Sequence, residues 1–340
     1  MQPITPLRFH PHFVSKPWGG RALESFMTGT LDEEGPIGEV WTLVDRDDVS
    51  SKTEGGEYDG RSLRGLMLSE RATLLGSDAE YFPILIKYLD VQANLSIQVH
   101  PDAAAAKLLG GGASSKTECW YILDAKPDAQ IYLGFAEGVD ANEIAEKLCT
   151  SDCVDVLQVH PIRKGDFVFV PAGTVHALCG GVTLVEVQQN SDTTYRVYDW
   201  GRVGLDGKPR ELHVQEALSS IDYESNPPGP VQPKFIDPEA INPRAHLLGD
   251  EAPFSVDLVH VNEPYQAKEG KRARAIIVLS GTGRLCFGSH TNAEDADTQM
   301  TGGECAIHSG ETWLIPAGIG SYRLDSANGD LRLLEAEVDE

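Results

Sequence analysis

Polar side chains that could bind a metal ion occur at three places along the chain. In residues 92–100 (QANLSIQVH), apolar and polar residues alternate. This alternation predicts a strand with Gln98 and His100 on one face, about 7 Å apart, where an amide and an imidazole could converge on one ion. Taken alone, this run is slightly more typical of a half-buried strand whose polar face is exposed to water.

Glu118 and His176 occupy the other two places. Glu118 opens a strand-like apolar run, and His176 follows a Pro-Ala-Gly turn within the apolar stretch 168–178. Considered separately, Glu118 is more typical of a surface carboxylate exposed to water, and His176 is more typical of a histidine buried in the core. Together with Gln98 and His100, they form a set of oxygen and nitrogen donors without thiolate, which suits zinc, iron(II), manganese or nickel.

The chemistry expected of such a set is Lewis acid catalysis. Only Glu118 carries a formal negative charge, so the bound ion would stay strongly Lewis acidic. With four protein donors, it could still take a water or substrate oxygen as a further ligand.

Short β-rich runs, separated by glycine and proline, are expected to form the strands that position these donors. Their number predicts a mainly β chain built as a sandwich or barrel. The predicted strands are 38–44, 84–100, 119–123, 130–135, 166–171 and 182–189. Helices are predicted over 62–75, 102–109, 141–148 and 211–221, with Asp102 as an N-cap.

A repeat divides the chain in two. Residues 162–176 (IRKGDFVFVPAGTVH) return as 307–321 (IHSGETWLIPAGIGS), at a constant offset of 145. Each copy predicts a turn, a strand and a Pro-Ala-Gly turn into the next strand. Ser321 stands where the first copy has His176, so we expect two related β-barrels of which only the first holds a metal ion.

The formal net charge of −24 argues against nucleic acid or an anionic membrane as a partner. Residues 1–8 lack a signal-peptide pattern, no apolar run has membrane-spanning length, and the six cysteines are scattered. The cysteines are therefore interpreted as reduced thiols, and a cytoplasmic location is expected.

An anionic substrate would be repelled by this overall charge and would need local cations. The segment 196–210 supplies Arg196, Arg202, Lys208 and Arg210. The alternative is that these cations only neutralise the nearby Asp199, Asp206 and Glu211.

Six motifs resemble type I mannose-6-phosphate isomerases (phosphomannose isomerases), in the short bacterial form without a helical insertion. They are KPWGG (16–20), GEVW (38–41), LSIQVHPD (95–102), KTE (116–118), VPAGTVH (170–176) and QNSDTTYRVYD (189–199). The resemblance, with these specific motifs, covers about residues 4–220, and the remainder is similar in architecture only. The sequence departs from the pattern at Cys119-Trp120, where other members often carry smaller or different apolar residues.

This resemblance implies two cupin domains, each a jelly-roll-like β-barrel. With the repeat and the irregular run 224–233 (ESNPPGPVQP), it predicts a catalytic metal-binding domain over 1–223 with helices packed outside it, a linker over 224–234, and a degenerate metal-free domain over 235–340. The implied activity is the zinc-dependent interconversion of mannose 6-phosphate and fructose 6-phosphate through a cis-enediol, with one zinc ion per chain. A monomer and a homodimer are both compatible with the sequence.

The resemblance also assigns site residues. Its zinc ligands correspond to Gln98, His100, Glu118 and His176, and its further active-site positions to Ser96, Lys116, Glu186 and Arg196. Our hypothesis is that Glu186 or a zinc-bound water moves the proton, and that Arg196 stabilises the enediolate or grips the phosphate. Lys116 and Ser96 would help to bind the sugar phosphate. Trp18 either walls the sugar site or packs in the core.

Other functions remain open at this point. Two histidines and one carboxylate also form the iron triad of a non-haem iron(II) cupin oxygenase, although Gln98 as a fourth donor counts against it. A non-catalytic cupin that binds sugar phosphates is a second alternative, disfavoured by the presence of Glu186 and Arg196. An isomerase of a related sugar phosphate is a third.

Overall fold

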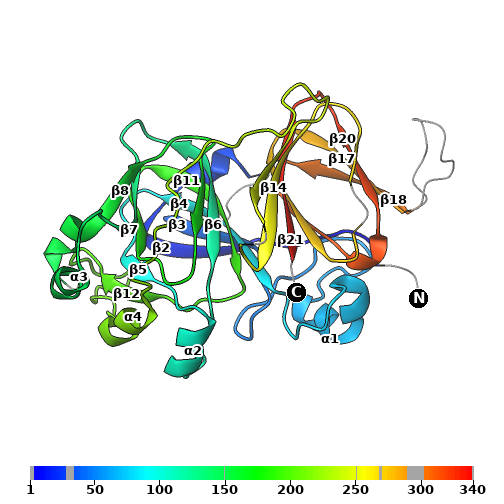
Figure 1. Ribbon diagram of the computed structural model, residues 1–340. Coiled ribbons are helices and arrows are strands. Elements are labelled where there is room, and N and C mark those ends of the chain that lie inside the picture. The colour runs from blue at the N-terminus through cyan, green and yellow to red at the C-terminus, as the bar shows by residue number, and fades with distance from the viewer. Residues whose placement is uncertain are drawn as a thin grey trace.

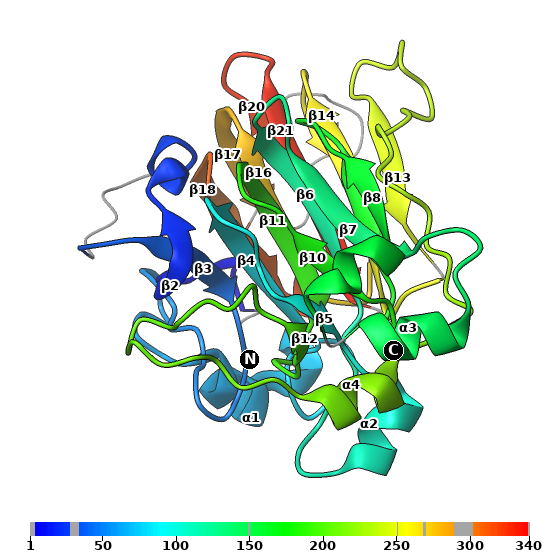
Figure 2. The same ribbon diagram turned by 90° about the vertical axis from the view of Figure 1, so that its left-hand side faces the viewer.

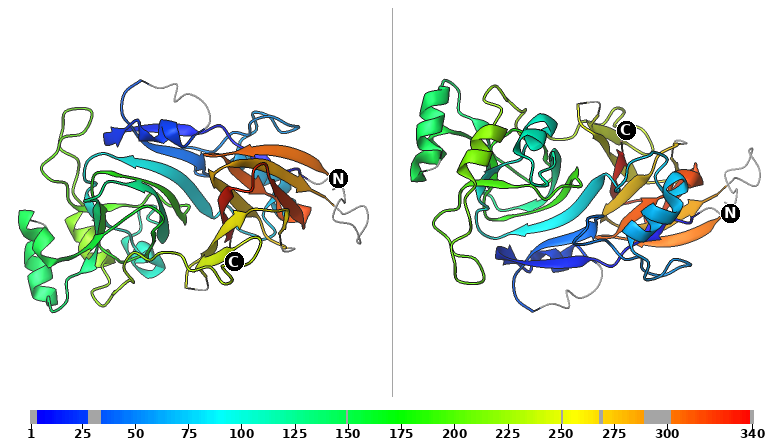
Figure 3. Two further views of the ribbon diagram at one scale, coloured as in Figure 1. Left: turned by 90° about the horizontal axis from the view of Figure 1, so that it is seen from above. Right: turned by 90° about the horizontal axis from the view of Figure 1, so that it is seen from below.

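The computed structural model describes residues 4–27, 34–148, 150–249, 251–267, 270–288 and 302–338. Within these ranges, the chain is mainly β and forms two lobes that lie side by side (Figures 1 and 3). Each lobe contains two open sheets, and none of these sheets closes into a barrel over the described residues. The expected mainly β class is confirmed, while the expected barrels are seen as pairs of facing sheets.

The N-terminal lobe consists of a six-stranded and a five-stranded sheet. The larger sheet has the order β2 (His12–Gly20), β3 (Ile37–Leu43), β4 (Ile84–Val91), β11 (Val182–Gln189), β6 (Glu118–Ala125) and β9 (Phe167–Val170). The smaller has the order β12 (Tyr195–Tyr198), β5 (Ile97–Val99), β10 (His176–Leu178), β7 (Gln130–Phe135) and β8 (Leu157–Pro161). β3 and β4 are buried at every residue, which explains their largely apolar composition.

The C-terminal lobe has the same two-sheet plan. Its six-stranded sheet has the order β1 (Leu7–Arg8), β19 (Thr312–Ile315), β16 (Arg274–Ser280), β21 (Leu331–Val338), β14 (Phe254–Val261) and β13 (Arg244–Leu248). Its four-stranded sheet has the order β15 (Tyr265–Gln266), β20 (Tyr322–Ser326), β17 (Thr282–Phe287) and β18 (Gly303–His308). Because β1 pairs with β19, the start of the chain contributes a strand to this lobe.

The repeat is visible in the fold. β9 and β19 occupy matching positions, 167–170 and 312–315, and each is followed by its Pro-Ala-Gly turn and the next strand, β10 or β20. The predicted strand–turn–strand unit is therefore confirmed in both copies. His176 begins β10, whereas Ser321 immediately precedes β20.

Four α-helices and three short 3₁₀ helices are described. They are α1 (Leu63–Leu74), α2 (Ala103–Leu109), α3 (Ala141–Lys147), α4 (Val214–Ser220), η1 (Ala22–Ser25), η2 (Ser151–Val156) and η3 (Ala317–Ile319). The predicted cap is present, since the Asp102 side chain accepts a hydrogen bond from the Ala105 amide at 2.7 Å. Figures 1 and 2 show α2, α3 and α4 at one end of the N-terminal lobe, where α4 contacts β5 and β12.

Helix α1 differs from the expectation that the helices pack outside the first domain. It lies beside the C-terminal lobe (Figure 1) and contacts η3. Its apolar side chains Leu63, Leu66, Met67 and Leu74 join a core that includes residues of both lobes. The sequence predicted the apolar face of α1, but it did not predict the surface against which this face packs.

One predicted strand is divided. The run 84–100 forms β4 and β5, which lie in different sheets of the N-terminal lobe. Between them the chain crosses from one sheet to the other, held by hydrogen bonds from the Gln92 amide to the Trp18 carbonyl and from the Gly180 amide to the Asn94 side chain. The strand that was predicted to place Gln98 and His100 on one face therefore has only three residues, and His100 directly follows it.

The linker segment 224–233 is irregular except for an isolated bridge between Val231 and Phe167. Free thiols are carried by Cys119, Cys179, Cys286 and Cys305, while Cys149 lies outside the described residues. Within the described ranges, no helix has the length and apolar character that crossing a membrane requires. The cytoplasmic location stays a prediction.

Candidate metal centre

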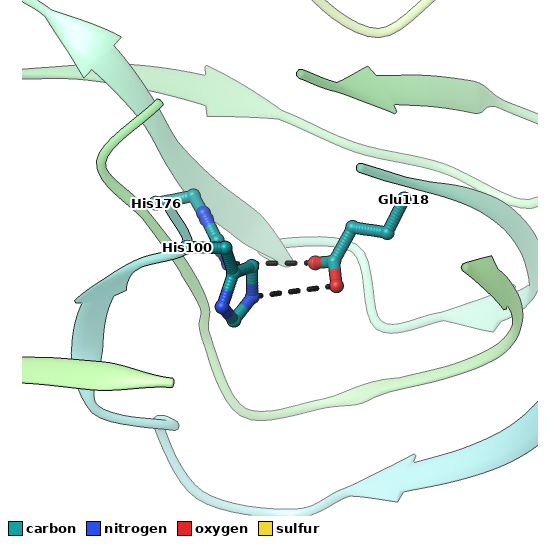
Figure 4. A group of neighbouring side chains, drawn as sticks. All are labelled: His100, Glu118 and His176. Atoms are coloured by element: carbon teal, nitrogen blue, oxygen red, sulfur yellow. Dashed lines mark ion pairs between the residues drawn. The ribbon is translucent and has the colours of Figure 1, made fainter. Parts of the chain in front are cut away.

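Three buried side chains converge between the two sheets of the N-terminal lobe. Glu118 begins β6, His176 begins β10, and His100 directly follows β5. The two carboxylate oxygens of Glu118 each lie 3.4 Å from the Nε2 atom of one histidine (Figure 4). One ligand atom from each residue lies within 4.8 Å of the others, so a single ion could bind all three. We call these residues the donor cluster.

Backbone carbonyls fix both imidazoles in the orientation that a metal requires. The Nδ1 atom of His100 lies 2.8 Å from the Thr193 carbonyl, and that of His176 lies 2.9 Å from the Thr174 carbonyl. Because a carbonyl only accepts, each Nδ1 carries the hydrogen and each Nε2 directs its lone pair into the cluster. Burial lowers the pKa of both histidines, that of His100 to about 3, so both are neutral, as metal ligands must be.

Glu118 supplies the negative charge of the donor cluster. Burial alone would raise its pKa, but the Lys116 ammonium, 2.5 Å from Oε2, and the two imidazoles hold the pKa well below its usual range. The same ammonium lies 3.1 Å from Nε2 of His100. The cluster thus already stabilises a positive charge, and its nitrogen and oxygen donors fit zinc or another borderline divalent ion.

Gln98 lies beside the donor cluster. It is paired with His176 across β5 and β10, with its Nε2 atom 3.3 Å from Nε2 of that histidine. Its Oε1 atom accepts a hydrogen bond from the Ser96 hydroxyl at 3.1 Å. Rotating the terminal amide exchanges its nitrogen and oxygen, so the oxygen can face the cluster. The position fits a fourth ligand, and that role stays a prediction.

A pocket adjoins the cluster and brings the other predicted site residues together. The predicted residues that line it are Trp18, Ser96, Gln98, Lys116, Glu186 and Arg196. Trp18 is 3% exposed and belongs to the apolar core of the lobe as well as lining the pocket, and its role as a wall of a sugar site stays a prediction. The remaining lining residues are Lys16, Glu39, Lys87, Leu89, Leu95, Asp192, Thr194 and Arg210.

Glu186 lies in the middle of β11, directly opposite Lys87 on β4. Its Oε1 atom is 3.4 Å from the Lys87 ammonium and 3.8 Å from that of Lys116. Burial raises the pKa of Glu186, the charge of Glu118 adds to this effect, and the two lysines oppose it. Lys116 therefore connects the donor cluster to a buried carboxylate whose affinity for protons is increased.

Arg196 is the pocket cation without a carboxylate partner. It lies on β12 opposite Gln98, and no described carboxylate lies within 4 Å of its guanidinium. Its Nε atom is buried without a hydrogen bond. Asp199, which could have paired with it, binds Arg202 and Arg210 instead.

Comparisons with known proteins agree with this geometry. Residues 7–135 match the family model described as the phosphomannose isomerase type I catalytic domain. Mannose-6-phosphate isomerase ManA of Bacillus subtilis is 32% identical over 321 residues, which cover 94% of this chain and 96% of that relative. The chain belongs to the mannose-6-phosphate isomerase family.

Solved structures support the same assignment. The crystal structure of the mannose 6-phosphate isomerase from Bacillus subtilis has a TM-score of 0.85 at 30% identity, covering 98% of this chain and all of that one. A zinc-bound mannose 6-phosphate isomerase has a TM-score of 0.74 at 16% identity, covering 99% of this chain, and shows the shared fold. The family resemblance inferred from the motifs is confirmed.

The sequence did not predict a buried charge network in which Lys87 bridges Glu186 and Glu39. Lys87, 6% exposed, places its ammonium 3.6 Å from Glu39 as well as 3.4 Å from Glu186. Glu39 also accepts a hydrogen bond from the Trp41 indole at 2.7 Å and pairs with Lys16 at 3.0 Å. Burial alone would raise the pKa of Glu39, but Lys87 and Lys16 lower it to about 2. A lysine within the apolar strand sequence ILIKYLDV was the available signal, because lysine is almost never fully buried unless paired.

We expect Lys87→Met to destabilise the protein strongly. The substitution leaves Glu39 and Glu186 buried without the cation that they share. Removing one partner of a buried ion pair costs about 3–5 kcal/mol, so the free energy of unfolding should fall by about that amount in urea denaturation. Lys147→Met, which removes an exposed pair with Glu143, should change it by less than about 0.5 kcal/mol. Equal stability of the two variants would contradict a structural role for Lys87.

Proposed function

We propose that this chain interconverts mannose 6-phosphate and fructose 6-phosphate as a zinc-dependent aldose–ketose isomerase. The observation that carries the proposal is the buried donor cluster of His100, Glu118 and His176, which adjoins a cation-lined pocket in a member of this family. The ManA relative bears the name mannose-6-phosphate isomerase, and the structural neighbour described above binds zinc.

The residues present fit a zinc ion. Two neutral imidazoles with anchored Nδ1 atoms, an ionised carboxylate and an adjacent amide would hold it: His100, His176, Glu118 and Gln98. When bound, zinc supplies a Lewis-acidic positive charge that stabilises negative charge on a sugar oxygen. Ser321 takes the place of His176 in the second copy of the repeat, which supports one ion per chain.

Isomerisation requires ring opening, removal of the proton at C2 and delivery of a proton to C1. Glu186 is our candidate for moving this proton, because its carboxylate lines the pocket and its pKa is raised by burial and by the charge of Glu118. A base whose pKa is closer to the working pH can both accept and return a proton. Lys87 and Lys116 contact its Oε1 atom and hold the carboxylate in place.

The pocket's other polar groups suit binding of the anionic intermediate. Lys116 places positive charge beside the donor cluster, where an enediolate would develop, in a buried environment in which charges interact strongly. Arg196 adds a further pocket cation that can bind the phosphate. Ser96 lies beside Gln98 and can contact a sugar hydroxyl, and Trp18 forms an apolar wall. These assignments explain how a chain with a net charge of −24 can bind a phosphorylated sugar.

We also propose that the two lobes are cupin domains. Residues 1–223 would form the metal-binding domain, 224–234 the linker and 235–340 the degenerate domain. The matching positions of β9 and β19 in the repeat support common ancestry of the two halves. The pairing of β1 with β19 means that the N-terminal residues would complete the second domain rather than the first.

A coupled assay tests the proposed activity. Purified protein should convert mannose 6-phosphate into fructose 6-phosphate and the reverse, lose this activity with a chelator, and regain it when zinc is added. An iron(II) oxygenase would instead consume oxygen after iron loading, and a binding protein would retain both sugar phosphates without converting them. Absence of turnover in a zinc-loaded sample would contradict the proposal.

A further inference from the structure

Two guanidinium groups line the pocket, and the proposed isomerisation uses only one of them. Arg196 comes from β12, and Arg210 comes from the loop that follows this strand. The lysines of the pocket are each engaged by a carboxylate: Lys16 by Glu39, Lys87 by Glu39 and Glu186, and Lys116 by Glu118. Among the described residues, Arg196 has no carboxylate within 4 Å, and Arg210 shares the single carboxylate of Asp199 with Arg202.

Asp199 holds Arg210 in a fixed orientation. The Nε and Nη2 atoms of Arg210 donate hydrogen bonds to the two carboxylate oxygens of Asp199, at 2.7 and 2.6 Å. Asp199 is 5% exposed, and although burial would raise its pKa, the hydrogen bonds from Arg210 and Arg202 lower it. One edge of the Arg210 guanidinium is thus occupied, while its Nη1 atom donates to no other described residue.

The two pocket arginines repel each other. The pKa of Arg196 is lowered by burial and then by the nearby charge of Arg210. The charges of Asp199, Asp192 and Glu211 oppose this effect, but among the described residues none of these carboxylates forms an ion pair with Arg196. An anion that accepts hydrogen bonds from both guanidinium groups would remove the repulsion, and a phosphate group has the oxygen atoms to do so.

We propose that Arg210, oriented by Asp199, binds the phosphate group of the substrate together with Arg196. The inference rests on the proposed function for the identity of the ligand as a sugar phosphate. The reacting carbons of a hexose 6-phosphate, C1 and C2, lie at the opposite end of the molecule from its phosphate. The phosphate therefore needs cations that are separate from the donor cluster, and the two pocket arginines supply them. Asp199 is then a positioning residue.

Arg202 provides a matched control. It also binds Asp199, through Nη2 at 2.6 Å, but its Nη1 atom donates to the Asn94 carbonyl at 2.5 Å. Arg202 lines a neighbouring surface groove and not the pocket. Arg202 therefore fits the alternative in which the cations of segment 196–210 only neutralise nearby acidic residues. Arg210 also pairs with Asp199, but it lines the pocket.

Calorimetric titration of the metal-loaded protein with inorganic phosphate tests the proposal. Arg210→Gln should weaken phosphate binding by about 10- to 100-fold, because charge-assisted hydrogen bonds are lost. Arg202→Gln should weaken it by less than about threefold. In steady-state assays with mannose 6-phosphate, Arg210→Gln and Asp199→Asn should raise KM with little change in kcat, and Arg210→Lys should recover part of the loss.

Three results would overturn this assignment: no phosphate binding by the wild type, equal phosphate affinity of the wild type and Arg210→Gln, or equal losses in Arg210→Gln and Arg202→Gln. The last result would mean that Asp199 and its arginines only maintain the loop. Thermal unfolding of each variant checks the fold. Because phosphate binding is measured without turnover, its outcome is independent of the isomerase assay, and an active isomerase with an unchanged KM in Arg210→Gln rejects this site alone.

Discussion

Glu118→Gln is expected to abolish metal binding and activity together. Glu118 carries the only formal negative charge of the proposed ligand set and is the residue that both histidines face at 3.4 Å. Loss of a partner outside the ligand shell typically weakens metal affinity by about 10–100-fold, so loss of a ligand should weaken it by more than about 100-fold. Metal analysis of the purified variant should then find little zinc, and isomerase activity should fall in proportion.

The control for this variant is Glu143→Gln, which removes an exposed carboxylate paired with Lys147. It should retain the wild-type zinc content and activity. A Glu118→Gln protein that is folded, carries a full equivalent of zinc and turns over normally would exclude the donor cluster as the metal site.

Glu186→Gln is expected to separate metal binding from proton transfer. The amide keeps the size of the side chain but cannot accept the C2 proton, so kcat should fall by about 10²–10⁴-fold, the usual contribution of a general base. Zinc content should be unchanged, since Glu186 contacts Lys87 and Lys116 and none of the proposed ligands. Exchange of the C2 proton of mannose 6-phosphate with deuterated solvent, followed by NMR, measures the step directly.

Glu211→Gln is the comparison for that experiment, because the Glu211 side chain is 83% exposed. Normal C2 exchange in Glu186→Gln would remove this residue as the base. A simultaneous loss of zinc in that variant would instead show that Glu186 supports the donor cluster.

Local pattern identified much of the site before its geometry was known. Alternation around Gln98 and His100 predicted that these residues share a strand face, and they lie at one cluster even though the strand is short. The Pro-Ala-Gly turn predicted the position of His176 within the repeat. Glu118 joined the set through its donor type, a plausible geometry and the family resemblance, because nothing in its own segment distinguishes a buried ligand from a surface carboxylate.

Features that depend on distant pairing were not predictable in the same way. The pairing of β1 with β19 joins residues from opposite ends of the chain, and α1 packs against a lobe that follows it in sequence. The short β-runs predicted strands but not whether the sheets close, because closure depends on such long-range pairs. The buried network of Glu39, Lys87 and Glu186 requires three strands to be adjacent, an order that strand propensity does not reveal.

The most direct test is to measure zinc content and isomerase activity in the same samples during stepwise removal of metal by a chelator. We expect about one zinc per chain at full activity, a proportional decline of zinc content and activity, and recovery of both when zinc is restored. Full activity in protein that contains no metal would contradict the donor cluster as the catalytic centre.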